Sequence, residues 1–156
     1  MFYPKPAVRL FKKKEFFSEA ENQQIVQAIR EAERMTSGEI RIFVEHRCRF
    51  VHAMDRALEV FEKLQMHQTR SRNGVLVYVA TRDRQFAILG DDGIHAKVGS
   101  HFWDTQAAIM RQHFSGGHFV EGIAACARSI GEVLQQYFPY ESDDENELPD
   151  DIVFGK

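Results

Sequence analysis

The chain has 156 residues, with 20 lysines and arginines against 23 aspartates and glutamates, so its formal net charge is −3. This length suits a single domain. Hydrophobic residues make up 44% and charged residues 28%, as in ordinary globular proteins, which excludes a disordered or collagen-like chain. A dedicated nucleic-acid-binding protein normally carries a strong basic excess, so the charge argues against that class.

The charge is unevenly distributed along the chain. Residues 141–156 hold seven acids and one base, a net −6, whereas residues 1–140 carry a net +3. We therefore expect an N-terminal arm over 1–14, one α/β domain over 15–140 and an acidic tail over 141–156. Because residues 152–154 are apolar, we expect the end of the tail to dock on the body or on a partner.

The N-terminal residues lack the features of an export signal. No apolar run approaches the roughly 20 residues of a transmembrane helix, and no apolar segment precedes a small-residue cleavage site. We therefore expect a cytoplasmic protein in which Cys48 and Cys126 are reduced thiols. Arg47 and Arg49 could lower the pKa of Cys48, although an unreactive thiol is the simpler interpretation.

The first predicted element is a helix that begins at Ser18. Ser18 and Glu21 have the spacing of a capping box, in which each side chain accepts a hydrogen bond from the other residue's backbone N–H. We expect the helix to end near Met35, with Gly38 available for a left-handed turn. Apolar residues recur at helical spacing between these ends, at Ile25, Ala28, Ile29 and Ala32.

Three strands and a second helix are predicted next. Apolar residues alternate over 39–45, which indicates a strand, and one apolar face over 52–66 indicates a helix. The continuous apolar run at 75–80 suits a strand buried on both faces. Residues 85–89 form a third strand, and the short polar turn before them can join only antiparallel neighbours.

Helical segments complete the predicted domain. We expect a short helical turn over 94–98 and a helix over 102–114, which ends at the two glycines that follow. The last helix covers 119–138 and ends at Pro139, because proline cannot continue the helical hydrogen bonds.

The order of these elements predicts the fold. The first two strands flank a helix, and such a connection is a right-handed crossover that makes them parallel. The third strand then runs antiparallel to the second. We therefore expect an α/β protein, a three-layer α/β/α sandwich around a central mixed, twisted sheet.

This topology is expected to bring three carboxylates to one edge of the sheet. The third strand should end beside the starts of the first two, which places Asp91 and Asp92 near Glu39. Carboxylate oxygens beside turns rich in glycine suit Ca²⁺ or Mg²⁺. Spacing alone favours a simpler interpretation, in which an aspartate caps the next helical turn and Glu39 pairs with Arg41 or Arg72.

Familiar catalytic motifs are absent from the sequence. It contains no Gly-x-Ser-x-Gly elbow, no Walker loop and no dinucleotide-binding glycine motif. The spacing of the potential zinc ligands matches no compact zinc module, so we expect surface or capping histidines. These residues are His101, His113, His118 and Cys126.

Four separated segments resemble the TPM domain family, which is named after a thylakoid lumen protein, a photosystem II repair protein and a receptor modulator. The resemblance covers roughly residues 15–140 and looks closest to short bacterial members that consist of this domain alone. It implies the α/β/α fold predicted above. The segments are Thr36–Arg41, Asn73–Tyr78, Phe86–Ile94 and the stretch from Phe102 to Ile123.

The resemblance also implies functions that spacing does not show. Some members bind divalent cations, notably calcium, and others act as interaction modules. We therefore expect a protein that binds Ca²⁺, or else Mg²⁺, and acts as an interaction or regulatory module with an unidentified protein partner. The candidate metal ligands are Asp91, Asp92, Glu39 and Asp104.

Two alternatives stay open. A plant member of the family is associated with weak acid phosphatase activity, so the chain could be a metal-assisted phosphatase in which the metal polarises a phosphoryl oxygen. Arg41 or Arg72 would then stabilise phosphate charge, although the sequence shows no evident nucleophile. The other alternative is a structural adaptor that recruits a partner through the tail or the N-terminal arm.

Overall fold

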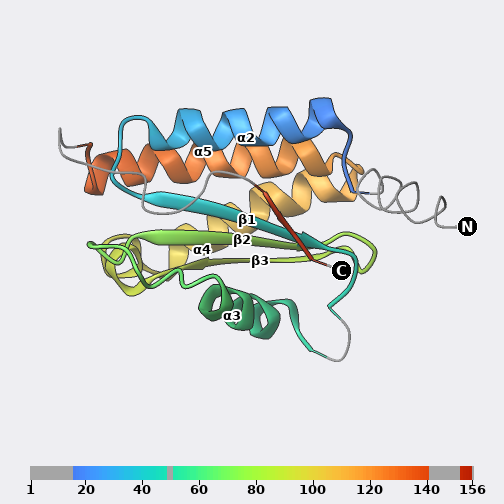
Figure 1. Cartoon of the computed structure of the whole chain (residues 1–156), viewed down its shortest axis with the longest axis horizontal. Coiled ribbons are helices and arrows are strands. Elements are labelled where there is room, and N and C mark those ends of the chain that lie inside the picture. The colour runs from blue at the N-terminus through green and yellow to red at the C-terminus, as the bar shows by residue number, and fades with distance from the viewer. Residues whose placement is uncertain (1–15, 49–50, 141–151, 156) are drawn as a thin grey trace, which may run out of the picture.

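The computed structural model describes residues 16–48, 51–140 and 152–155. Figure 1 shows a central sheet with α2, α4 and α5 on one face and α3 on the other. This arrangement confirms the predicted α/β/α sandwich. The elements are α2 (Glu19–Glu33), β1 (Glu39–Glu45), α3 (Ala53–Lys63), β2 (Gly74–Ala80), β3 (Gln85–Gly90), α4 (Asp92–Ser115), α5 (Phe119–Tyr137) and β4 (Val153–Phe154).

The sheet is mixed and has the strand order β3-β2-β1-β4. β1 and β2 are parallel, and β2 and β3 are antiparallel, as predicted. The short strand β4 pairs in parallel with β1, with Phe154 opposite Val44. The apolar end of the chain therefore docks on the body, as expected.

Both faces of the sheet are covered by helices, which explains why β1 and β2 are buried along their whole length. The face toward α2, α4 and α5 carries Ile40, Ile42, Val44, Val75, Val77, Val79 and Ile88. The face toward α3 carries Phe43, Leu76, Tyr78, Ala80 and Ala87.

Helix α2 begins as predicted. The Glu21 N–H donates to Ser18 Oγ at 3.1 Å, and the Ser18 N–H donates to Glu21 Oε1 at 2.8 Å, which completes the capping box. The helix ends at Glu33, two residues before the expected Met35.

The expectation of a left-handed Gly38 is wrong. In the described chain the glycines with positive φ are Gly99 and Gly117. A Cβ on Gly38 would lie 2.6 Å from Leu134 Cδ2, so this glycine lets α5 approach the start of β1 closely.

Helix α4 joins two segments that were expected to be separate. Its helical conformation begins at Asp92 and is interrupted at Gly99, which has a φ of 74°. Glycine adopts this left-handed conformation without the steric cost that a Cβ imposes. The kink thus divides a short helical segment over 92–98 from the longer part of the helix that covers the sheet.

Some sequence predictions lie outside the described residues. The arm at 1–14 and the acidic residues at 141–151 are among them, so the domain boundaries stay a prediction. None of the described helices is long and apolar enough to cross a membrane. A cytoplasmic location likewise remains a prediction from the sequence.

Candidate functional site

As expected, β3 ends at the same end of the sheet at which β1 and β2 begin. Glu39 is paired with Gly74 in the parallel register. The Gly74 carbonyl also accepts a hydrogen bond from the Asp91 N–H at 2.9 Å. The segments that carry Glu39, Arg72 and Asp91 therefore converge in space.

Asp91 is the centre of the polar contacts at this edge. Its carboxylate accepts hydrogen bonds from Arg72 Nε at 2.8 Å and from Arg72 Nη2 at 2.9 Å. It also caps helix α4 by accepting from the Asp92 N–H at 2.8 Å, and His67 Nδ1 lies 3.3 Å away. The capping interpretation of Asp91 is therefore confirmed.

The charge of Asp91 is stabilised despite its burial. Burial alone raises the pKa of this carboxyl, because an apolar environment disfavours the charged form. The hydrogen bonds from Arg72 and the Asp92 N–H, together with the Arg72 charge, outweigh burial and lower the pKa below its ordinary value. The same hydrogen bond raises the pKa of Arg72.

The loop before β2 is also held against the first turn of α4. The Arg72 carbonyl accepts from the Ile94 N–H at 3.3 Å. A Cβ on Gly93 would lie 2.1 Å from the Ser71 carbonyl oxygen, so only glycine permits this approach. This contact gives a physical reason for the glycine that follows the paired aspartates in the sequence.

The other predicted ligands differ in exposure. Glu39 is 2% exposed and Arg41 is also buried, both on β1. The Asp92 side chain, by contrast, is 91% exposed and lies 3.6 Å from Arg72 Nη2. Of the three converging carboxylates, Asp92 alone faces solvent.

Asp104 shares a hollow with Asp92. The hollow has a volume of about 360 Å³, and His95, Ser100 and Trp103 also line it. Trp103 Nε1 donates to His95 Nδ1 at 3.0 Å, and a Cβ on Gly90 would lie 2.3 Å from the Trp103 ring. Glycine at the end of β3 therefore leaves room for the Trp103 ring.

These residues fit a hydrated cation better than a protein cage. Within residues 16–48, 51–140 and 152–155, no three or more His, Cys, Asp or Glu side chains are arranged to hold a metal ion. Asp91 is already committed to Arg72 and to the helix cap. Asp92 and Asp104 are exposed, although Asp92 also lies 3.6 Å from Arg72 Nη2. Mg²⁺ or Ca²⁺ can be held by two carboxylates when water supplies the other ligands.

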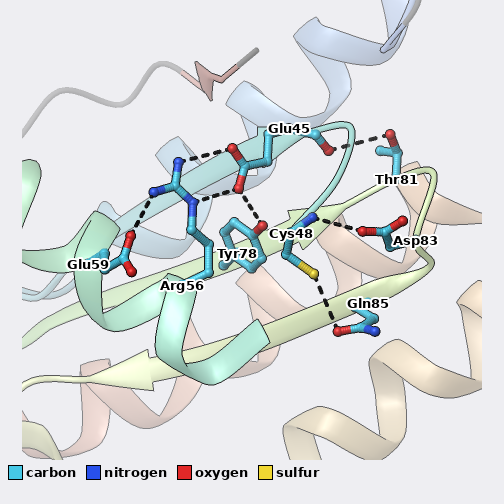
Figure 2. Close-up of polar contacts among 8 residues, drawn as sticks. All are labelled: Glu45, Cys48, Arg56, Glu59, Tyr78, Thr81, Asp83 and Gln85. Atoms are coloured by element: carbon cyan, nitrogen blue, oxygen red, sulfur yellow. Dashed lines mark hydrogen bonds and ion pairs between the residues drawn. The ribbon is translucent and has the colours of Figure 1, made fainter. Parts of the chain in front are cut away.

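A second polar cluster lies at the opposite end of β1 and β2 (Figure 2). Glu45 accepts from Arg56 Nε at 2.8 Å and Nη2 at 3.0 Å, and also from the Tyr78 hydroxyl at 2.5 Å. The hydrogen bond to Glu45 raises the pKa of Arg56. Burial and the same carboxylate raise the pKa of Tyr78. The buried Glu45 carboxylate thus accepts hydrogen bonds from two partners, one on α3 and one on β2.

Cys48 lies beside this cluster and is not activated. Its N–H donates to Asp83 Oδ2 at 2.8 Å, and its Sγ donates to Gln85 Oε1 at 3.4 Å (Figure 2). Burial and the Asp83 charge raise the pKa of Cys48, opposite to the effect considered for Arg47 and Arg49. Cys48 and Cys126 are both free, buried thiols.

The Glu45 cluster was not predicted from the sequence. One signal was present, because the alternation in β1 places Glu45 on the same face as the buried Phe43. A carboxylate at a buried strand position needs a partner. Arg56 is eleven residues away on α3, so only the packing of α3 on the sheet reveals the pair.

The fold and the hollow beside β3 define a small α/β sandwich domain with an open surface hollow that two aspartates line. The chain belongs to the TPM domain family, whose match covers residues 10–133. This finding confirms the resemblance carried by the four sequence segments.

Two solved structures are similar to this chain. One is the NMR structure of the BA42 protein from the psychrophilic bacterium Bizionia argentinensis, with 42% identity and a TM-score of 0.84 over 90% of this chain and 96% of that one. The other is the N-terminal domain of the cg2496 protein from Corynebacterium glutamicum. At 15% identity and a TM-score of 0.58, covering 76% of this chain and 74% of that one, it shows the fold alone. No curated protein matches the chain.

Proposed function

We propose that this TPM domain is an interaction or regulatory module that binds a divalent cation weakly at the hollow beside β3. The observation that supports the proposal is that Asp92 and Asp104, from the two segments of the kinked α4, line one hollow. The family resemblance favours Ca²⁺ over Mg²⁺.

The four candidate ligands take different parts in this proposal. Asp92 and Asp104 contact the cation, and water completes its coordination. Asp91 positions Asp92 by capping α4 and by holding Arg72. Glu39 is buried and does not contact the cation. A site with two protein carboxylates is expected to bind in the millimolar range, as weak extracellular calcium modules do.

An NMR titration of the full chain tests the proposal. Addition of CaCl₂ in the millimolar range is expected to move the amide signals of residues 91–95 and 103–105, because these amides flank both ligands. MgCl₂ is expected to move the same signals less. No movement of these signals at saturating CaCl₂ would contradict the proposal.

Matched variants separate the site from general charge attraction. The double variant Asp92→Asn/Asp104→Asn is expected to lose the shifts. Asp55→Asn removes one exposed aspartate from the first turn of α3, which does not line the hollow, and is expected to keep them. Equal loss in both variants would indicate a non-specific ion atmosphere.

A metal-assisted acid phosphatase is the second candidate. The observation that favours it is the Arg72 guanidinium, which is 45% exposed and lies beside Asp92. Arg41 is buried and therefore a poorer phosphate ligand. Turnover of p-nitrophenyl phosphate that falls in Arg72→Gln and in Asp92→Asn would support this activity. Turnover that persists unchanged in both variants would count against it.

A further inference from the structure

Strand β3 forms one edge of the sheet in the described chain. The Asp91–Gly74 hydrogen bond fixes which backbone groups of β3 face β2. In an antiparallel ladder the hydrogen-bonded residues alternate. The register therefore turns the N–H and C=O groups of Phe86, Ile88 and Gly90 away from β2.

A trough runs along this edge between two helices. One hollow of about 400 Å³ and the neighbouring one of about 360 Å³ share Met54, Ile88 and Trp103. The N-terminal end of α3 forms one wall, where Met54 is 45% exposed. Residues Trp103 and Ala107 of α4 form the other. The outward backbone groups of β3 thus lie at the base of a largely apolar trough.

Strand β3 itself carries none of the residues that usually protect an exposed edge. Natural proteins place charged residues or proline on edge strands to prevent pairing with other chains. The interior of β3 is instead Phe86-Ala87-Ile88-Leu89, without a charge or a proline. An edge of this composition can accept a further strand.

Charged side chains mark the two ends of the trough. Arg84 and Arg111 line it where β3 begins. Asp92 lines it where β3 ends, and Asp104 lies along the wall that both hollows share. The trough is therefore basic at one end and acidic at the other.

We infer that the β3 trough binds an extended peptide segment of a partner protein, which adds to the sheet as a further strand. The complementary segment is apolar along its centre, with a basic residue at the Asp92 end and an acidic residue at the Arg84 end. Pairing with all six residues of β3 requires a strand of about 20 Å. Main-chain hydrogen bonds supply affinity in this mode, and side-chain pockets supply specificity.

A single strand suits this surface better than a second copy of the chain. The walls formed by α3 and α4 border the edge on both sides, and a second sandwich would bring its own helices against them. This inference names the partner of the interaction role proposed above. It does not depend on the cation, and its test in EDTA separates its failure from failure of cation binding.

Hydrogen exchange followed by NMR is the direct test. The probe is the synthetic peptide acetyl-Lys-Val-Thr-Val-Thr-Val-Glu-amide, added to the full chain in EDTA. The expected result is slowing by about tenfold or more for the amides of Phe86, Ile88 and Gly90. The amides of Ala87 and Leu89 already face β2 and should change little. This alternation would not arise from non-specific binding.

One control peptide and one matched pair of protein variants make the test specific. A peptide with proline at its central position cannot complete the ladder, so it should give no protection. Ala107→Tyr fills the trough and should weaken binding by about tenfold. Ala108→Tyr adds the same ring to an exposed site on the same helix, outside the trough, and should leave binding within about twofold.

A charge variant tests the basic and acidic character assigned to the two ends of the trough. Arg111→Glu is expected to weaken binding of the Lys-to-Glu peptide by about two- to fivefold, because exposed ion pairs are weak. The same variant should bind a peptide with lysine at both ends better than the unaltered protein does. Absence of alternating protection, or equal protection by the proline peptide, would overturn the inference. Protection that appears without peptide as the molecular mass doubles would instead assign the edge to a second copy.

Discussion

Two glutamates contact the Arg56 guanidinium from environments of very different exposure. The Glu45 side chain is 7% exposed, whereas that of Glu59 is 59% exposed. Breaking a buried pair leaves an uncompensated charge, whereas exposed pairs contribute little. The two glutamates thus offer a matched comparison of a buried and an exposed partner of the same guanidinium (Figure 2).

Glu45→Gln is expected to lower the free energy of unfolding by about 2–3 kcal/mol, less than for a fully buried pair because Arg56 is partly exposed. Glu59→Gln should cost no more than about 0.5 kcal/mol. Urea denaturation followed by circular dichroism measures both. Similar losses in the two variants would mean that burial of Glu45 does not determine its contribution.

The Asp91 carboxylate predicts a pH dependence of stability. Its pKa lies below the ordinary value of 3.8 in the folded chain. Its contribution is therefore complete above pH 3.8 and is lost as the pH falls through the folded pKa. Asp91→Asn should be less stable than the unaltered protein at pH 7, and this difference should shrink below pH 3.8. Urea midpoints at a series of pH values measure it, and a constant difference would contradict the assignment.

At the scale of elements, the short strand β4 is expected to stabilise the domain. Phe154 lies 5.1 Å from Phe16 and 6.4 Å from Phe17, measured between ring centroids, and extends the core at the edge of β1. Phe154→Ala should lower the free energy of unfolding by about 2 kcal/mol, less than for a fully buried ring. Tyr140→Ala, at an aromatic residue that is 52% exposed, is the control and should change it by about 0.5 kcal/mol at most.

Local sequence patterns predicted the elements because each one obeys a short-range rule. The capping box predicted the start of α2, and hydrophobic patterns located β1, β2 and β3, three of the four strands of the sheet. Gly38 was misjudged because its role depends on Leu134, which is distant in the sequence. The joining of the two α4 segments through Gly99 also depends on backbone geometry that periodicity does not encode.

At the scale of the whole molecule, topology predicted which segments meet at one end of the sheet, whereas spacing predicted the Asp91 cap. Parallel and antiparallel strand directions were enough to bring Glu39, Asp91 and Asp92 to one edge. They were not enough to predict that Arg72 would pair with Asp91. That pairing depends on the loop before β2, which can approach α4 closely because residue 93 is glycine. The Glu45 cluster could not be predicted for the same reason, because its partner Arg56 comes from a helix packed on the sheet.

Binding of Ca²⁺ to the folded domain should stabilise the whole molecule. A ligand that binds only the folded state adds RT ln(1 + [L]/Kd), which is about 1.4 kcal/mol at ten times the dissociation constant. The unfolded chain separates Asp92 from Asp104 and loses the site. Urea denaturation in CaCl₂ should therefore show this gain over NaCl of equal ionic strength.

The net charge of −3 adds a competing effect, because any cation reduces repulsion among the carboxylates. That effect is shared by the unaltered protein and by Asp92→Asn/Asp104→Asn, whereas site binding is lost in the double variant. Asp55→Asn keeps the site and removes one charge, so it should retain the gain. If the double variant shows the same increase in the free energy of unfolding in CaCl₂, the increase comes from general charge screening. That result would contradict cation binding in the hollow.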